Sequence, residues 1–566
     1  MSKYLLALVS VAAVSGIASQ DPAHVVSPTA ERFAGFKPVT DAMLENPDPA
    51  DWINWRRTLD GWGYSPLDQI NRQNVKDLRP VWSHPLLPGV GEITPLVHNG
   101  IMYVAKPMFK SGVGGVVALD AASGDSIWEY KKELDFDPPF DGRIRSLAIY
   151  GDKIFLNTPD AHIVALDSRT GKVIWDHTVA DHKLGYRYTS GPLVVRGRIV
   201  AGMTGCDRFK NDVCFISAHD PQSGNELWRT PTIARPGEQG GDTWGDLPLT
   251  FRAGGDAWIP GSYDPKTNLI YWSTAQAKPW ARVSRGTDGD ALYTNSVLAL
   301  QPETGRMVWF RQLIHGESHD QDEVFESVLI DRKGRRSLFK MGKLGILWEL
   351  DRTNGQFVAA HDLGYQNIVN LDSKTGAITY RPEMLPKSGV PIDFCPGLGG
   401  LRNWRATAYH PETQALYIPL SLGCQQSVFK EVDKVEGGGG NTVRPYAGEV
   451  TVQSYAHPAS PGSRGRLIAM DIDTGRVIWE HISSRGPTSA ALTTAGGLVI
   501  VADGQPSVKA FDVKTGRLLL ESPMTIAGVG FPISFAVKGR QYVAIPSGNT
   551  APGISVFALP NAGTRN

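Results

Sequence analysis

Short apolar runs that end in a polar turn recur along the chain, and each turn is followed by a second run in which apolar and polar residues alternate. Alternation with a period of two is the pattern of a half-buried strand. A fold with helices between its strands needs long amphipathic stretches, and the sequence contains none of that kind. The pattern therefore predicts an all-β protein made of antiparallel hairpins.

A repeated motif marks these hairpins: Ala-x-Asp, a Gly four residues after the Asp, and a Trp four residues after the Gly. The Asp can accept hydrogen bonds from the turn, the Gly supplies a positive φ, and the Trp can pack its ring between neighbouring units. Five strong copies end at Trp128, Trp175, Trp228, Trp309 and Trp479, and three degenerate copies end at Ala359, Ile418 and Leu520.

The motif ends lie 41 to 81 residues apart, which fits blades of four strands joined by loops of variable length. Unrelated β-sandwiches would not explain one motif at eight places. We therefore predict a single eight-bladed β-propeller over residues 19–566. Part of residues 19–80 is expected to close the ring beside the last blade, and the glycine-containing stretch 425–464 to form an exposed, irregular excursion.

The first residues have the features of a secretory signal peptide. Lys3 precedes an apolar run from Tyr4 to Ala18 that is too short to span a bilayer, and the small residues Gly16 and Ala18 suit a cleavage site. A buried first helix is the alternative. We expect residues 1–18 to direct the chain to the periplasm, with no integral membrane anchor because no later run is long and apolar enough.

Composition narrows the class further. Lys+Arg and Asp+Glu both number 57, so the formal net charge is 0 and nucleic acid is not an expected partner. Apolar residues make up 41% of the chain, which excludes disorder. Export makes disulfides the expected state of the four cysteines, and of the three possible pairings we favour Cys206–Cys214 and Cys395–Cys424. No CxxCH occurs, which excludes a covalently attached c-type haem in this chain.

The repeat AxDxxTGxxxW resembles the tryptophan-docking motif of the quinoprotein alcohol dehydrogenases, the family of methanol and ethanol dehydrogenases that use pyrroloquinoline quinone (PQQ) in an eight-bladed propeller. The similarity covers nearly the whole mature chain. It includes the blocks DGWGYSPLDQINRQNVKDLRPVW (60–82), GGDAWIPGSYDPKTNLIYW (254–272) and GFPISFAVKGRQYVAI (530–545).

This resemblance implies a quinone in the central funnel, stacked on Trp258 of the GGDAW block. The residues that it places around the quinone's carboxylates and rim are Glu92, Arg145, Thr189, Thr204 and Gly205. Lys343 occupies the position of a family Arg or Lys that reaches the reactive carbonyls, and Asn403 and Trp404 lie at the quinone edge.

The family also implies a cation and a catalytic Asp, and here the sequence departs from its pattern. The usual Glu and Asn ligands read Asp207 and Gln276, whose hard oxygens still suit Ca²⁺, which we favour, or a lanthanide. The usual HDxWD segment reads HGESHDQDEVFES (315–327). Asp322 is our first assignment for the base and third ligand, with Asp320 and Glu323 as alternatives. A solvated acidic loop is the structural alternative for this segment.

We therefore expect a periplasmic dehydrogenase that oxidises an alcohol to an aldehyde or ketone. Hydride would pass to quinone C5, polarised by the metal ion, while Asp322 takes the hydroxyl proton. Electrons would leave to an external carrier such as a soluble cytochrome c. The family's adjacent cysteine pair is replaced by Pro139 and Phe140. Sugars or bulky, secondary or polymeric alcohols are therefore rival substrates, and a non-catalytic exported propeller scaffold is the alternative from another class.

Overall fold

The computed structural model describes residues 32–86, 89, 91–112, 114–139, 142–438, 448–548 and 552–560. The expected signal peptide and Phe140 lie outside the described residues. Lys37–Asn566 form one compact unit. None of the described helices is long and apolar enough to cross a membrane.

Antiparallel four-stranded sheets make up most of the unit. The first three sheets along the chain are β3 (Leu96–His98), β4 (Ile101–Lys106), β5 (Gly115–Asp120) and β6 (Ser126–Lys131); β7 (Ala148–Tyr150), β8 (Lys153–Asn157), β9 (His162–Asp167) and β10 (Val173–Thr178); and β11 (Leu193–Val195), β12 (Arg198–Gly202), β13 (Phe215–His219) and β14 (Glu226–Pro231). The next three are β16 (Ser262–Asp264), β17 (Leu269–Ser273), β19 (Ser296–Leu300) and β20 (Met307–Gln312); β21 (Val328–Arg332), β22 (Arg335–Met341), β23 (Ile346–Asp351) and β24 (Phe357–Asp362); and β28 (Ala408–His410), β29 (Ala415–Ser421), β32 (Gly465–Asp471) and β33 (Val477–Ser483).

The last two large sheets recruit strands from the start of the chain. One joins β34 (Leu492–Thr494), β35 (Leu498–Asp503), β36 (Ser507–Asp512) and β37 (Leu518–Pro523) to β1 (Tyr64–Ser65), and the other joins β38 (Ile533–Val537), β39 (Arg540–Ser547) and β40 (Gly553–Ala558) to β2 (Arg79–Pro85). Because β2 pairs with β40 along six residues, an early segment lies beside the last strands. The prediction that part of residues 19–80 closes the ring holds only for Arg79 and Pro80, since the strand continues to Pro85.

Smaller elements connect these sheets. They are the ladders β15 (Ala253–Gly254) with β18 (Ala277–Lys278), β25 (Val369–Leu371) with β26 (Ile378–Tyr380), and β27 (Pro391–Phe394) with β30 (Gly423–Phe429) and β31 (Glu449–Ala456). The helices are α2 (Asp41–Glu45) and α3 (Arg282–Arg285), with 3-10 turns η1 (Val75–Asp77), η3 (His182–Leu184), η4 (Gly241–Trp244), η5 (Leu249–Phe251) and η6 (Pro382–Met384).

The expectation of an irregular excursion over residues 425–464 is wrong for β30 and β31. These strands pair with each other and with β27, and their inward polar groups bond one another: Gln425 and Ser427 both donate to the buried Glu449 carboxylate. Alternation along a strand tolerates polar inward positions when they satisfy each other. Residues 439–447 of this stretch lie outside the described part of the chain.

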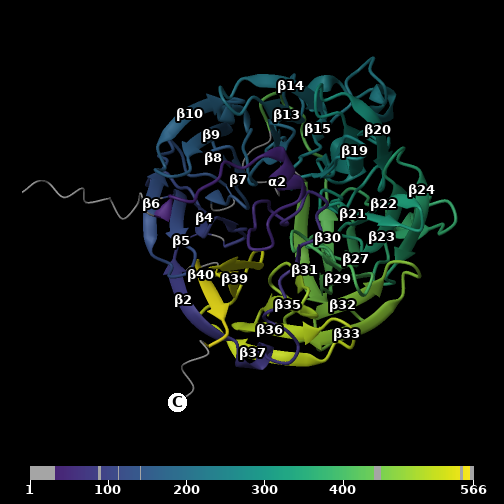
Figure 1. Cartoon of the computed structure of the whole chain (residues 1–566). Coiled ribbons are helices and arrows are strands. Elements are labelled where there is room, and N and C mark those ends of the chain that lie inside the picture. The colour runs from purple at the N-terminus through teal and green to yellow at the C-terminus, as the bar shows by residue number, and fades with distance from the viewer. Residues whose placement is uncertain are drawn as a thin grey trace, which may run out of the picture. The chain divides into compact units, whose positions relative to one another are not determined.

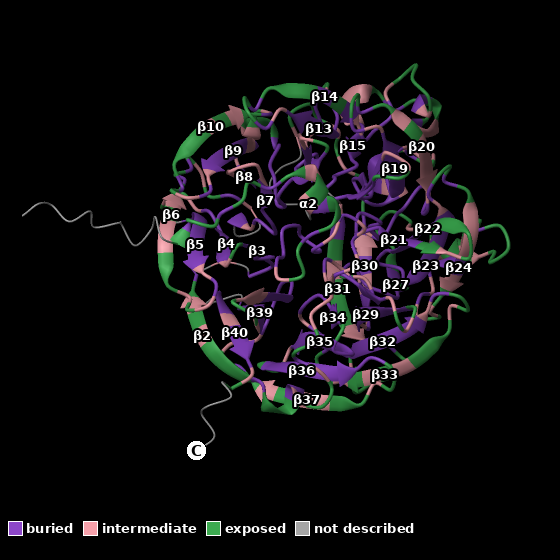
Figure 2. Ribbon diagram, in the orientation of Figure 1, coloured by how far each residue is buried: buried purple, intermediate pink, exposed green. Residues whose placement is uncertain are grey.

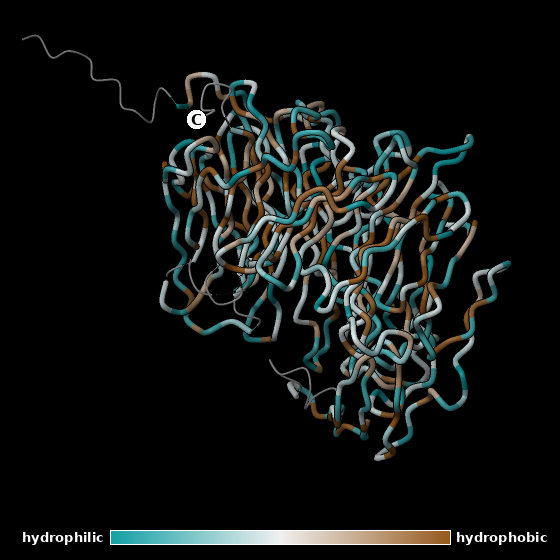
Figure 3. Tube along the Cα trace, turned by 90° about the horizontal axis from the view of Figure 1, so that it is seen from below, coloured by the Kyte–Doolittle hydropathy of each residue, from teal (hydrophilic) through white to brown (hydrophobic). Residues whose placement is uncertain are grey.

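The large sheets succeed one another in chain order around a ring (Figure 1), and this radial arrangement is a β-propeller. Burial follows the radius: inner strands such as β3 and β11 are buried throughout, whereas the peripheral strands β6, β10 and β37 alternate between exposed and half-buried positions (Figure 2). In the side view, hydrophobic segments run through the interior and much of the outer chain is hydrophilic (Figure 3).

The five repeated Trp residues each join their sheet to the following one. Trp128 Nε1 donates to the Ser168 carbonyl at 3.0 Å, and its ring covers Gly171, where an added Cβ would lie 2.4 Å from a ring carbon. Trp175, Trp228, Trp309 and Trp479 make the corresponding bonds to Pro221, Pro302, Arg352 and Val513. The Gly of each turn therefore meets two demands, since Gly171 has a φ of +69° and no room for a side chain.

Gly171→Ala tests this packing, with Gly151→Ala as its matched control. Both glycines have positive φ, but an added Cβ at Gly151 meets nothing within 4 Å. The control should lower the free energy of unfolding by about 1 kcal/mol, the conformational cost alone. Gly171→Ala should lower it by about 1–3 kcal/mol more, because the ring must move. Guanidinium unfolding followed by Trp fluorescence measures both, and equal losses would contradict the packing account.

Candidate active site

A cavity of about 1030 Å³ opens in the unit, lined by loops that lead into the innermost strands of successive sheets. Most residues expected at the site line it: Glu92, Arg145, Thr189, Thr204, Trp258, Gln276, Asp320, Asp322, Lys343, Asn403 and Trp404. Gly205 and Asp207 are not among the described lining residues, and Asp207 is fully buried. The alternative base Glu323 is also fully buried away from the lining.

Arg145 and Glu92 form a fixed pair on one wall. Arg145 Nε and Nη2 donate to Glu92 Oε2 at 3.0 and 2.7 Å, and Nη1 reaches Thr189 Oγ1 at 3.1 Å. Its guanidinium lies 4.8 Å from the centre of the Trp258 ring. Burial lowers the pKa of Arg145 to about 10, with Glu92 opposing, so the group stays charged at neutral pH. This wall therefore presents a positive charge beside an indole face.

On another part of the wall, one lysine bridges two aspartates. Lys343 Nζ lies 2.9 Å from Asp322 Oδ2 and 3.1 Å from Asp320 Oδ2. Gln276 donates its backbone N–H to Asp322 at 3.2 Å and its side-chain amide to Asp320. Burial raises the pKa of Asp320 well above its usual value despite Lys343, and Asp322 adds to the shift. The charges of both aspartates outweigh burial and raise the pKa of Lys343.

Sequence reasoning missed a third charged pair, Lys278 and Asp256. Both side chains line the cavity, and Lys278 Nζ lies 2.9 Å from Asp256 Oδ2. Asp256 lies within the block GGDAW and Lys278 within STAQAKPW, and these two opposite charges were the available signal. Arg143, Arg187 and Arg405 also line the cavity and were not foreseen. In all, six basic and four acidic side chains face this space.

The three expected cation ligands differ in whether their oxygens already have partners. Both carboxylate oxygens of Asp207 and Oε1 of Gln276 are buried and have no hydrogen-bond partner among the described residues. The nearest basic group to Asp207 is Arg187, whose Nη2 lies 3.8 Å from Oδ2. Asp322, the third expected ligand, is already bonded to Lys343.

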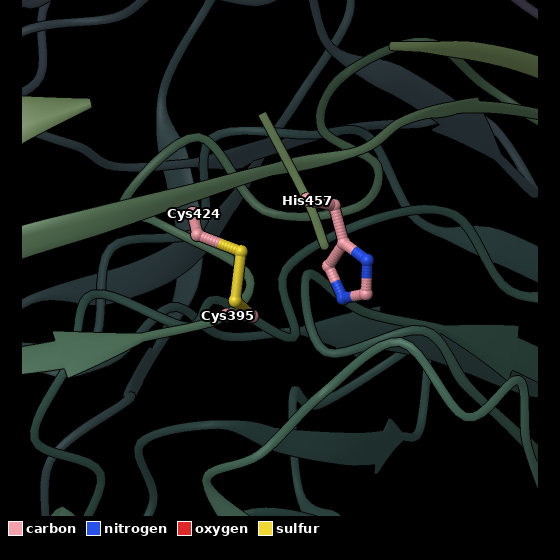
Figure 4. A group of neighbouring side chains, drawn as sticks. All are labelled: Cys395, Cys424 and His457. Carbon is pink, nitrogen blue, oxygen red and sulfur yellow. A yellow bond between two sulfur atoms is a disulfide. The ribbon is translucent and has the colours of Figure 1, made fainter. Parts of the chain in front are cut away.

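Both expected disulfides are confirmed. Cys206–Cys214 and Cys395–Cys424 join Cα atoms 5.5 and 4.4 Å apart. His457 lies beside the second bridge (Figure 4), and Asp256 lies beside the first. Neither group is a metal site of the thiolate kind, because its sulfur atoms are bonded to each other.

Comparison with known proteins shows the family of the chain. The family model for the glucose, ethanol and alcohol dehydrogenase β-propeller domain of PQQ enzymes matches residues 52–361 and 366–543. The chain belongs to the family of PQQ-dependent quinoprotein alcohol dehydrogenases. It is therefore an enzyme of the oxidoreductase class, and the resemblance drawn from its repeats and blocks is confirmed.

Individual relatives agree along most of the chain. It is 32% identical to the quinohemoprotein alcohol dehydrogenase ADH IIB of Pseudomonas putida, over 93% of this chain and 77% of the relative. It is 31% identical to the quinoprotein alcohol dehydrogenase PedH of Pseudomonas putida, over 90% and 88%. A solved europium-containing methanol dehydrogenase superposes with a TM-score of 0.83 at 26% identity, over 92% of this chain and all of the other.

The Lys343 bridge gives a stability prediction. Lys343→Met leaves two buried aspartates without their cation and should lower the free energy of unfolding of the apo-protein by about 3–5 kcal/mol at pH 7. Lys266→Met removes an exposed Lys–Asp pair and should cost about 0–1 kcal/mol. Guanidinium unfolding checks both, and a loss at Lys343 as small as that at Lys266 would refute the bridge.

Proposed function

We propose that the chain oxidises an alcohol to an aldehyde or ketone in the periplasm and passes the electrons to an external carrier. The observation that carries this proposal is the cavity, in which an indole face and an excess of basic groups suit a flat polyanion. We further propose that each of the eight large sheets is one blade of an eight-bladed propeller, docked through its repeated Trp.

The side chains fit PQQ, which is flat, tricyclic and carries three carboxylates. Trp258 is held edge-on by Phe325, with ring centres 5.4 Å apart at 90°, so one face can stack on a planar ligand. Arg145, Arg405 and Lys343 offer charged donors, and Nε of Arg405 has no partner among the described residues. Thr189, Thr204, Asn403 and Trp404 complete the binding set. When bound, PQQ supplies the two-electron acceptor.

The chain's own chemistry is proton transfer from the alcohol. We assign Asp322 as the base, because Lys343 and the Gln276 backbone N–H hold its carboxylate at the cavity wall. A carboxylate within hydrogen-bond reach of the hydroxyl can accept its proton. Asp320 shares the same lysine and stays the alternative. Trp280, Leu398 and Trp404 line the cavity and exclude water from the reacting groups.

The name of one relative supports a proposal for the electron carrier. No CxxCH occurs in this chain. One relative, 29% identical, is a 1-butanol dehydrogenase (cytochrome c) of Thauera butanivorans. We propose a soluble cytochrome c as the acceptor and an alcohol as the substrate, with sugars or bulky, secondary or polymeric alcohols as the rival substrate class. A scaffold without catalysis is set aside by the family membership.

The residues near the cavity also have to be compared with what the expected Ca²⁺ or lanthanide ion would need. Asp207 and Gln276 offer hard oxygens without other partners, but Asp207 does not line the cavity. Lys278, Arg187 and Lys343 occupy the space beside the acidic groups that would hold a cation. The residues do not fit a cation as they fit the quinone, and no step of the reaction is assigned to one.

Trp258→Ala tests cofactor binding. PQQ added to the apo-protein should quench Trp fluorescence saturably, and the variant should bind about tenfold more weakly or worse, since stacking and ring burial are lost. Trp479→Ala, which removes a similarly half-buried ring outside the cavity, should bind normally. Unchanged affinity in Trp258→Ala would place the quinone elsewhere.

Asp322→Asn tests the base. PQQ affinity should hold while turnover with an artificial acceptor falls about 10²–10⁴-fold. Asp320→Asn is the matched variant and should retain most activity. If Asp320→Asn is the inactive one, the base is Asp320.

Secondary and polyol substrates measured beside ethanol would identify the substrate class.

A further inference from the structure

Lys278 and Asp256 form a buried ion pair next to the backbone of Gly205 and Cys206. The ladder of β15 and β18 pairs Ala253 with Lys278 and Gly254 with Ala277. This pairing brings the segment that ends at Trp258 against the segment that begins at Gln276. Asp256 and Lys278 consequently face each other across the ladder's end, and both reach the cavity.

Backbone hydrogen bonds and a close ion-pair contact hold both side chains of the pair in place. Asp256 accepts the backbone N–H groups of Gly205 at 2.7 Å and Cys206 at 3.2 Å through Oδ1, and Lys278 Nζ lies 2.9 Å from Oδ2. Burial opposes ionisation of Asp256, but Lys278 and Arg187 hold its pKa below the usual value. Burial likewise opposes the charge on Lys278, but Asp256 and Asp207 raise its pKa.

Every acidic group near this point already has a basic neighbour. Asp256 has Lys278, and Asp322 has Lys343. Asp207, the anion that a metal ion would need most, accepts no hydrogen bond from the described residues, but it has the Arg187 charge at 3.8 Å and does not line the cavity. A Ca²⁺ ion takes six to eight oxygen ligands, mainly carboxylates, carbonyls and waters. The local charges leave little attraction for a second cation.

The Lys278 ammonium can do what such an ion would do for a bound polyanion. It is a compact positive charge with three donors, one of which is held by Asp256, and it projects into the cavity that also contains Trp258. We propose that Lys278, held by Asp256, replaces the metal ion at the cofactor site, so that quinone binding by this chain requires no divalent or trivalent cation. This proposal rests on the proposed PQQ function.

Two measurements on the wild-type protein test it. Tb³⁺ is added to the apo-protein, because Trp258 and Trp280 line the cavity and would sensitise the luminescence of an ion bound there. PQQ affinity is then measured by Trp quenching in EDTA, in Ca²⁺ and in La³⁺. We expect no sensitised Tb³⁺ emission from the cavity, and a PQQ affinity that varies less than about threefold among the three conditions, under 1 kcal/mol.

Lys278→Met supplies the variant arm, and Lys509→Met is its matched control. Lys509 pairs with Asp503 at 2.7 Å with the same side-chain exposures as the Lys278–Asp256 pair, 10% and 5%, but outside the cavity lining. In EDTA, Lys278→Met should bind PQQ about tenfold more weakly, and Ca²⁺ or Tb³⁺ should restore part of the loss because Asp256 becomes a free ligand. Lys509→Met should match the wild type.

The outcomes separate the two proposals. Two results would overturn the proposed role of Lys278 but leave the proposed PQQ function standing. One is sensitised Tb³⁺ emission from the wild type that is lost in Asp207→Asn, and the other is wild-type PQQ binding that weakens about tenfold in EDTA. Failure of the wild type to bind PQQ in any condition would overturn the proposed function together with it. If Lys278→Met does not fold, Lys278→Arg, which keeps the charge, should still bind PQQ in EDTA, and a cation requirement in that variant would contradict the proposal.

Discussion

A charge taken out of water needs a partner, and this requirement shapes the cavity more than any other interaction. Arg145 has Glu92, Lys343 has two aspartates, and Lys278 has Asp256. Each pair joins residues from different loops, so the loops hold one another in place. The basic groups remain in excess, and that excess is what prepares the space for an anionic cofactor before it binds.

The propeller provides the rigidity that such pairing needs. Each repeated Trp donates to a carbonyl of the next sheet and covers the Gly of its turn, as Trp128 does with Ser168 and Gly171. The pairing of β2 with β40 closes the ring. Loops anchored to such a ring can hold charged groups at fixed distances before the cofactor binds. Loops on a mobile scaffold would have to be ordered at each binding event, and the lost conformational entropy would weaken binding.

The sequence predicts the repeating hairpins well because the motif is local: an Asp, a Gly and a Trp within one turn determine it. Trp258 could be placed by its family block, and Arg145 and Lys343 by the family resemblance of their immediate neighbours in the sequence. The sequence shows the opposite charges of Lys278 and Asp256 but not that they pair, since the pairing exists only because β15 and β18 align. The burial of Asp207 and the pairing of β30 with β31 also depend on tertiary contacts that no short pattern records.

The central claim is that PQQ stacks on Trp258 in a cavity whose positive charge comes from side chains. A crystal structure of the PQQ complex, from crystals soaked in Tb³⁺ and measured at the terbium absorption edge, tests it most directly. The account predicts the quinone on Trp258 with the Lys278 ammonium bonded to its oxygens, and no anomalous peak between Asp207 and Gln276. A strong peak there, with Lys278 turned away from the quinone, would contradict it.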